Sequence, residues 1–306
     1  MTTTTKRPWH MFYPLAGMLL ISMIWSCYWY FAFTKAQEIA AIQRKELAAQ
    51  GFRFTCGHES WHGFPFRFEF QCEGVTINYA NATLKTAKVL AVAQAYNPFH
   101  ILFLVNGPTS VAKDGLPVAA ATHDDVLISL LLNGKGDWDV SSDVAHVIVP
   151  ELFSSASLKL FTRKYNGRID FAGNTDGLEV RGPNNSHVSI DHAEFLAQAS
   201  DRASLDITAF NISAGSVKFD GAGKVNLDAN HLLAGKLSTQ TNDIDGLLRL
   251  ISPLLEMNDK DQGAIKSLLA MHGNSAKSSA QKADFIGRDG AIFWGQFKLT
   301  DLQPLY

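Results

Sequence analysis

An apolar run near the N-terminus constrains the chain more than any other feature. Residues 14–33 read PLAGMLLISMIWSCYWYFAF and contain no Asp, Glu, Lys or Arg. A run of about 20 apolar residues is long enough for an α-helix to cross a hydrocarbon core of ~30 Å. The sequence therefore predicts a transmembrane helix over 13–33, with the lipid bilayer as the partner of residues 14–33.

The residues at the two ends of this run predict its orientation. Lys6 and Arg7 precede it, and no acidic residue does. The positive-inside rule therefore leaves 1–12 as a cytoplasmic tail and places the rest of the chain across the membrane. Trp and Tyr side chains are concentrated in 25–30, and amphipathic rings favour the headgroup level. We expect a single-pass protein with its large C-terminal part outside the cytoplasm.

Three other interpretations of the run fit it less well. A cleaved signal peptide has a shorter apolar region and an Ala-x-Ala-like site, whereas bulky Tyr30, Phe31 and Phe33 surround the small residues here. Lipoprotein processing at Cys27 calls for a small residue where Trp25 stands. A buried helix of a soluble domain rarely stays apolar on every side over such a length.

The remainder of the chain has the composition of a folded domain. Hydrophobic residues make up 46% of the 306 residues and charged residues 18%, which is unlike a disordered chain. Lys and Arg number 27 against 29 Asp and Glu, without a basic cluster, which argues against nucleic acid as a partner. We predict a helical stalk over 34–50 and one periplasmic β-rich domain over 51–306. The alternative for 34–50 is that the stripe of Ile39, Ile42 and Leu47 rests on the domain.

After Gly51 the apolar period changes to two, the period of a strand buried on one face. Apolar residues alternate with polar ones in two runs: Phe52, Phe54 and Cys56, then Phe66, Phe68, Phe70 and Cys72. The five phenylalanines form a possible apolar face. Such a face either binds a ligand or fills a dry core, and the dry core is the more common case.

The pair Cys56 and Cys72 flanks a predicted hairpin. With Gly63-Phe64-Pro65 as its loop, the hairpin places Cys56 directly opposite Cys72. Opposed Cα atoms at ~4.5–5.5 Å suit a disulfide, and disulfides persist outside the cytoplasm. We predict that these two cysteines are bonded.

Turn dipeptides divide the remaining sequence into short alternating segments, as in an antiparallel meander. The predicted turns are Asn106-Gly107-Pro108, Asp114-Gly115, Asn133-Gly134, Asn166-Gly167, Asp176-Gly177 and Asp220-Gly221. Residues 83–96 and 191–200 contain enough Ala to be short helices instead.

Near the C-terminus the pattern becomes helical. Apolar spacing predicts helices over 244–255 and 261–272, and a closing hairpin follows with its turn at Asp289-Gly290. The predicted fold class is mainly β (α+β). It is a large curved antiparallel β-sheet meander with an N-terminal transmembrane helix and two C-terminal helices packed on the sheet.

One motif suggests chemistry that its context opposes. His58-Glu59-Ser60-Trp61-His62 matches H-E-x-x-H, which binds zinc when it lies on a helix. On a strand the two imidazoles lie ~13 Å apart, too far for one ion. A Cys₂His₂ site from Cys56, His58, His62 and Cys72 is the alternative to the disulfide. We predict no metal, no cofactor, no catalytic residues and no enzymatic activity.

The run Gly63-Phe64-Pro65-Phe66-Arg67, followed by Cys72, resembles the signature of the domain of unknown function 2125 family. Three further features of the sequence agree with the family pattern: the N-terminal anchor, Asn106-Gly107-Pro108, and Asp289-Gly290 ahead of Gly295, Leu299 and Pro304. The resemblance implies an alphaproteobacterial envelope protein of unknown activity, and we predict that this protein lies in the bacterial inner membrane. It also implies a likeness to AsmA-type envelope proteins, whose curved sheets are thought to handle lipid.

Three functional hypotheses follow from these observations. The first is a protein that binds lipid or another apolar ligand in envelope maintenance or transport. The second is a structural or scaffold protein of the envelope with a protein partner. The third, an envelope hydrolase, lacks an assembled nucleophile and base in the sequence.

Overall fold

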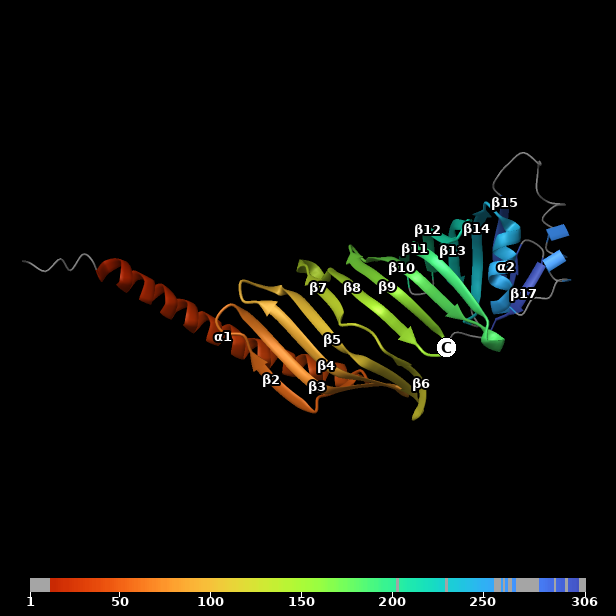
Figure 1. Cartoon of the computed structure of the whole chain (residues 1–306). Coiled ribbons are helices and arrows are strands. Elements are labelled where there is room, and N and C mark those ends of the chain that lie inside the picture. The colour runs from red at the N-terminus through yellow and green to blue at the C-terminus, as the bar shows by residue number, and fades with distance from the viewer. Residues whose placement is uncertain are drawn as a thin grey trace, which may run out of the picture.

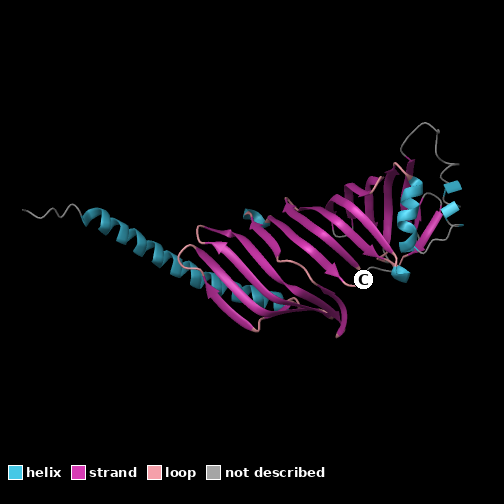
Figure 2. Ribbon diagram, in the orientation of Figure 1, coloured by secondary structure: helices cyan, strands magenta, loops and turns pink. Residues whose placement is uncertain are grey.

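The computed structural model describes residues 12–201, 204–228, 231–255, 260, 262–263, 266–267, 281–288, 290–294 and 297–302. A long helix, one 17-stranded sheet and a second helix form this part of the chain (Figure 1). Helix α1 (Tyr13–Ala49) lies at one end of the sheet and α2 (Ile244–Leu255) at the other (Figure 2).

Helix α1 runs without a break over 37 residues. Pro14 lies in its first turn, where no backbone N–H is needed. The helix ends where Gly51 takes a φ of +90°, a conformation that favours glycine. Large apolar side chains of its first half are exposed, and the helix is long and apolar enough to cross a membrane.

The sheet is an open meander, as predicted. Its strands are β1 (Arg53–Thr55), β2 (His58–His62), β3 (Arg67–Tyr79), β4 (Ala82–Gln94), β5 (Asn97–Lys113), β6 (Leu116–Ala121), β7 (Val126–Leu132), β8 (Trp138–Val149), β9 (Phe153–Tyr165), β10 (Arg168–Arg181), β11 (His187–Asp201), β12 (Ser204–Ala214), β13 (Val217–Leu227), β14 (Leu233–Thr241), β15 (Gln281–Arg288), β16 (Ala291–Trp294) and β17 (Phe297–Asp301). Consecutive strands pair antiparallel from β7 to β17. Strand β3 pairs with β1, β2 and β4, and β5 pairs with β4, β6 and β7.

The Ala-rich segments are strands, and three predicted turns are wrong. Residues 83–96 and 191–200 belong mainly to β4 and β11. Asn106-Gly107-Pro108, Asp176-Gly177 and Asp220-Gly221 lie inside β5, β10 and β13 instead of ending a strand. Gly221 is needed there for a close approach, because a Cβ atom at this position would lie 2.5 Å from the carbonyl oxygen of Ser238.

Helix α2 begins where the sequence predicts. The Asp243 carboxylate accepts a hydrogen bond from the Gly246 N–H at 2.9 Å, which caps the helix N-terminus. Leu247 and Leu248 are buried against Val217 and Trp294. Most of the predicted helix 261–272 lies outside the described residues, as do Asp289, Gly295 and Pro304 of the closing hairpin.

Two further clusters complete the described core. Trp29, Phe68 and Ala95 are buried together where α1 meets the sheet. Val144, Val147 and Val149 on β8 are buried with neighbouring apolar side chains from β6, β7 and β9: Ala119, Ala121, Val126, Phe153 and Leu158. The described core is therefore three separate clusters spread along one long sheet.

Candidate functional site

Aromatic side chains join α1 to the β2–β3 hairpin, and we call this contact the junction. Trp29 stacks on Phe33 and contacts Phe68 with ring centroids 5.8 Å apart. Phe33 also lies edge-on to Trp61 of β2. Trp25, Trp29 and Phe33 lie four residues apart, so they share one side of the helix.

Three side-chain donors of α1 bind backbone carbonyls of the sheet. Trp25 Nε1 donates to the Pro65 oxygen at 2.8 Å, and Trp29 Nε1 donates to the Arg67 oxygen at 3.2 Å. The Tyr28 hydroxyl donates to the Ala95 oxygen at 2.9 Å. The β2–β3 and β4–β5 loops are thereby fixed on a helix that precedes them by roughly 40 to 70 residues.

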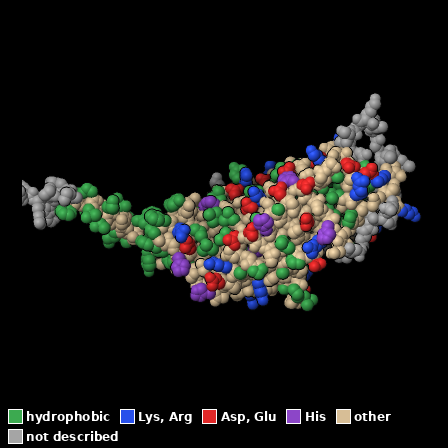
Figure 3. All heavy atoms as spheres, viewed as in Figure 1, with side chains coloured by type: hydrophobic (Ala, Val, Ile, Leu, Met, Phe, Trp, Pro, Cys, Tyr) green, Lys and Arg blue, Asp and Glu red, His purple; other side chains and the backbone are tan. Residues whose placement is uncertain are grey.

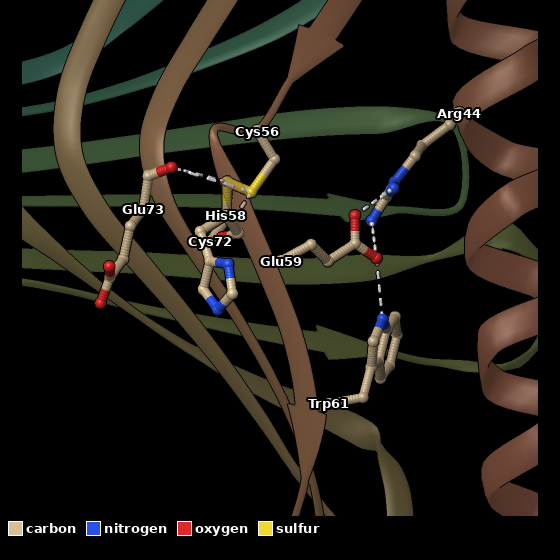
Figure 4. Close-up of polar contacts among 7 residues, drawn as sticks. All are labelled: Arg44, Cys56, His58, Glu59, Trp61, Cys72 and Glu73. Atoms are coloured by element: carbon tan, nitrogen blue, oxygen red, sulfur yellow. Dashed lines mark hydrogen bonds and ion pairs between the residues drawn. A yellow bond between two sulfur atoms is a disulfide. The ribbon is translucent and has the colours of Figure 1, made fainter.

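Further along α1, Arg44 forms a two-pronged ion pair with Glu59 of β2 (Figure 4). Its two terminal nitrogens lie 2.8 and 3.1 Å from the carboxylate oxygens. The hydrogen bond from Arg44 is the main reason that the pKa of Glu59 lies below its usual range, and Trp61 Nε1 adds a second donor. The guanidinium also lies over the rings of Phe54 and Phe70.

Residues 34–50 are therefore held against the sheet. The contact does not use the predicted stripe, because Ile39, Ile42 and Leu47 are exposed. It uses Arg44 and the backbone of Leu47, whose oxygen accepts the Phe52 N–H at 2.9 Å.

The structure contains the Cys56–Cys72 disulfide, with Cα atoms 5.6 Å apart. The predicted hairpin register is wrong, however. Glu59, not Cys56, lies opposite Cys72, and Cys56 bonds diagonally from the gap between β1 and β2. The turn is wider than predicted. Trp25 of α1 donates to the Pro65 oxygen in this loop and Trp29 donates to the Arg67 oxygen at the start of β3, and the alternation of β3 gives no sign of these tertiary contacts.

The five phenylalanines of the predicted face do not all share one surface. Phe54 and Phe70 lie under Arg44, and Phe68 lies under Trp29. Phe66 is in the β2–β3 loop, where it is exposed beside Trp25. Phe52 precedes β1 and stacks on Tyr79. The alternating pattern correctly places Phe68 and Phe70 of β3 on one face. It fails for Phe52 and Phe66, which lie outside the strands.

The H-E-x-x-H segment is a strand, as predicted. His58 and His62 are the first and last residues of β2, and Glu59 between them is bonded to Arg44. Both cysteines nearby are in the disulfide, so neither is a thiolate ligand. Among the described residues, no group of three or more His, Cys, Asp or Glu side chains is placed to hold a metal ion.

The strand registers reveal a second, larger feature that the sequence does not predict. Residues directly opposite each other on neighbouring strands point to the same face of a sheet, so a row of partners can be followed across it. The first row is Phe68, Ala93, Ile101, Leu130, Val140, Thr162, Phe171, Ala197, Ile207, Gly223, Leu237, Phe285 and Trp294. The second row is Phe70, Ala91, Phe103, Ile128, Ser142, Leu160, Gly173, Phe195, Phe210, Gly221 and Thr239.

We call these two rows the apolar face. Neither row contains a charged residue. The first row starts under α1 at Phe68 and ends at Trp294, which α2 helps to bury. The main contacts of the two helices with the sheet are those of α1 with β1 and of α2 with β11 and β13. In the second row, Leu160 of β9 and Phe195 of β11 remain 42% and 40% exposed.

The opposite face carries charged and polar cross-strand pairs, together with exposed apolar side chains such as Phe161 and Leu196. Cross-strand pairs such as Asp143–Lys159, Asp139–Arg163 and Asp170–Gln198 lie on it, each from residues between those of the apolar rows. A hollow of about 520 Å³ on this face is lined by several of the same side chains. Figure 3 shows charged and histidine side chains over the visible middle of the molecule, and hydrophobic ones along the protruding part of α1.

Comparison with known proteins identifies one family. A sequence model described as "Uncharacterized protein conserved in bacteria (DUF2125)" matches residues 29–159 and 166–303. No match is found among curated proteins or among solved structures.

Proposed function

The chain belongs to the DUF2125 family of uncharacterized bacterial proteins, and we propose that it is a membrane-anchored protein that binds lipid acyl chains along the apolar face of its sheet. The observation that carries the proposal is the two rows of partners without a charged residue. An apolar face of this kind is normally covered by the protein itself. Here the described helices cover only its two ends.

The dimensions of the uncovered part support an acyl chain as the ligand. Strands lie about 4.8 Å apart, so the five paired strands β5, β7, β8, β9 and β10 span roughly 19 Å. One leaflet of the hydrocarbon core, half of ~30 Å, is about 15 Å thick. An extended acyl chain laid across these strands would therefore contact apolar side chains over its whole length.

The face also begins beside the proposed anchor. Phe68, the first member of the first row, is in contact with Trp29 of α1. A lipid leaving the bilayer at α1 would meet apolar side chains at once, without crossing the opposite face. We propose that this face acts in lipid transport or in maintenance of the bacterial envelope.

The proposed location is the inner membrane, with the N-terminus in the cytoplasm and the sheet in the periplasm. Lys6 and Arg7 before the helix support this orientation, and the Cys56–Cys72 disulfide agrees with an oxidising compartment. A C-terminal alkaline phosphatase fusion should be active, and a C-terminal green fluorescent protein fusion should be dark. The opposite pair of results would reverse the orientation.

Native mass spectrometry of the full chain, extracted in mild detergent, tests lipid binding. The wild-type protein should carry at least one lipid adduct. Phe171→Ser alters the apolar face, and Phe161→Ser removes the same kind of side chain from the opposite face, on the neighbouring strand. We expect Phe171→Ser to lose most of the adduct and Phe161→Ser to retain it.

A folded wild-type protein without lipid, or equal adduct loss in both variants, would contradict the proposal. Circular dichroism and the intact disulfide serve as checks that each variant is folded. A milder variant, Phe171→Val, keeps an apolar side chain and should retain more lipid than Phe171→Ser.

A further inference from the structure

We propose that the β2–β3 and β4–β5 loops form a rim that enters the outer half of the bilayer beside α1. The rim consists of Phe64, Phe66, Tyr96 and Phe99. This inference rests on the membrane anchor of the proposed function, but it does not depend on lipid binding by the apolar face.

Exposure and contact set these four side chains apart. Their exposed fractions are 60%, 64%, 69% and 62%, although each is a large aromatic ring. The two loops lie side by side, because the Ala95 N–H donates to the Phe66 oxygen at 2.8 Å. Clustered exposed aromatic rings mark an interaction surface, and amphipathic or aromatic rings suit the membrane interface.

The junction fixes the depth of the rim relative to the helix. Trp25 bonds to the Pro65 oxygen, and its ring lies 6.4 Å from the ring of Phe66. Trp25 is eight residues before Phe33, the last residue of the apolar run, and at 1.5 Å per residue this separation is about 12 Å along the axis. A bilayer that covers the helix to Phe33 would therefore also cover the rim.

The polar residues next to the rim limit how deep it lies. Arg67 follows Phe66 directly and is mostly exposed, with an ion pair to Glu69. A charged side chain of this kind favours the headgroup level over the hydrocarbon centre. The hydrocarbon boundary therefore lies near Trp25 and Trp29. The membrane-spanning segment then begins and ends closer to the N-terminus than the predicted residues 14–33.

The sequence is compatible with a membrane-spanning segment that begins before residue 14. Trp9 is the first aromatic residue after Lys6 and Arg7. At 1.5 Å per residue, a helix from Trp9 to Trp29 would be about 30 Å long, the thickness of the hydrocarbon core. Tryptophan would then mark both boundaries, as is common in membrane proteins.

The rim is continuous with the apolar face. Phe99 is two residues before Ile101 of the first row, and Leu132 is two residues after Leu130 of the same row. Because strand side chains alternate and Leu132 is regularly paired with Trp138, Leu132 points to the apolar side of the sheet. The apolar face thus reaches the bilayer at the rim.

Fluorescence quenching in nanodiscs tests the rim. The full chain carries Cys27→Ser, so that a thiol-reactive fluorophore labels only an introduced cysteine, since Cys56 and Cys72 are bonded. Phe66→Cys and Tyr96→Cys place the label on the rim. Leu116→Cys is the control, because Leu116 is 70% exposed but begins β6, at the far end of β5 from Tyr96.

Lipid carrying a nitroxide near its headgroup should quench the labels at 66 and 96 severalfold more than the label at 116. Aqueous iodide should give the reverse order. Strong iodide quenching at all three positions, without quenching by the lipid nitroxide, would overturn the inference. Nitroxide quenching at the rim in a protein without lipid adducts would refute acyl-chain binding but not the rim. Lipid adducts in a protein without nitroxide quenching at the rim would refute the rim but not acyl-chain binding.

Discussion

Glu59 links α1 to the sheet through a charge, and its contribution to stability depends on pH. The Arg44 hydrogen bond lowers the pKa of Glu59 from a reference value of 4.5. The ionised carboxylate therefore stabilises the fold above that value, and this stabilisation is lost as the pH falls through the lowered pKa of the folded state.

Glu59→Gln should accordingly destabilise the protein only when the carboxylate is charged. Because both partners are about one-third exposed, we expect a loss of at most about 1 kcal/mol in the free energy of unfolding at pH 7. The difference from wild type should shrink in acid, below the reference pKa. Denaturant unfolding of both proteins at pH 7 and at a pH below 4.5 measures this difference in stability. A difference that does not depend on pH would contradict the stabilising role of the ionised Glu59.

The disulfide is the second feature that acts at the level of single residues. Cys56→Ser combined with Cys72→Ser opens a loop with a sequence separation of 16. In the chain-entropy model, loss of such a bond lowers the free energy of unfolding by about 3 kcal/mol. Unfolding of the oxidised wild type and the double variant measures the loss. Equal stability of the two proteins, or free thiols in the unreduced wild type, would contradict this prediction.

At the level of elements, α2 is held by one fully buried side chain. Leu248 has no exposed surface and lies in the cluster with Val217 and Trp294. Leu248→Ala should lower the free energy of unfolding by about 2–5 kcal/mol, because it removes buried methyl groups and leaves a cavity.

The neighbouring Arg249 is exposed and provides the matched control for α2. Arg249→Ala should change the free energy of unfolding by less than about 0.5 kcal/mol. Denaturant unfolding of both variants compares them. Equal effects of the two substitutions would mean that α2 does not pack on the sheet as described.

The elements also show what sequence patterns predict well. The long helix, the meander and α2 follow from periodicity and turn residues, because these are local properties. The strand positions of residues 106–108, 176–177 and 220–221 were not predictable in this way. Glycine there allows close packing against the His123 ring at Gly107, a positive φ at Gly177 and close contact with a neighbouring strand at Gly221. Sequence alone does not separate such uses from a turn.

The candidate site was less predictable than the fold. Alternation identified Phe68 and Phe70, but the two apolar rows depend on the register of every strand pair. A shift by one residue in any pair would move a row to the other face. The junction depends on contacts between α1 and loops far along the chain, and no local pattern encodes those contacts.

At the scale of the whole molecule, the apolar face of the sheet runs from α1 to α2, and the opposite face carries the charged cross-strand pairs. Two of the three clusters of the described core lie under α1 and α2, and the third lies on β8 between them. A dry core would need further side chains over β5–β10. A bound acyl chain would supply the missing contacts instead.

Photo-crosslinking in intact membranes tests most directly whether lipid binds to the apolar face. A benzophenone amino acid at position 171 faces the apolar rows, and the same group at position 161, on the adjacent strand, lies on the opposite face. We predict lipid-mass adducts at position 171 and none at position 161. Folded protein without lipid adducts at 171, or with equal adducts at both positions, would contradict the proposed binding face.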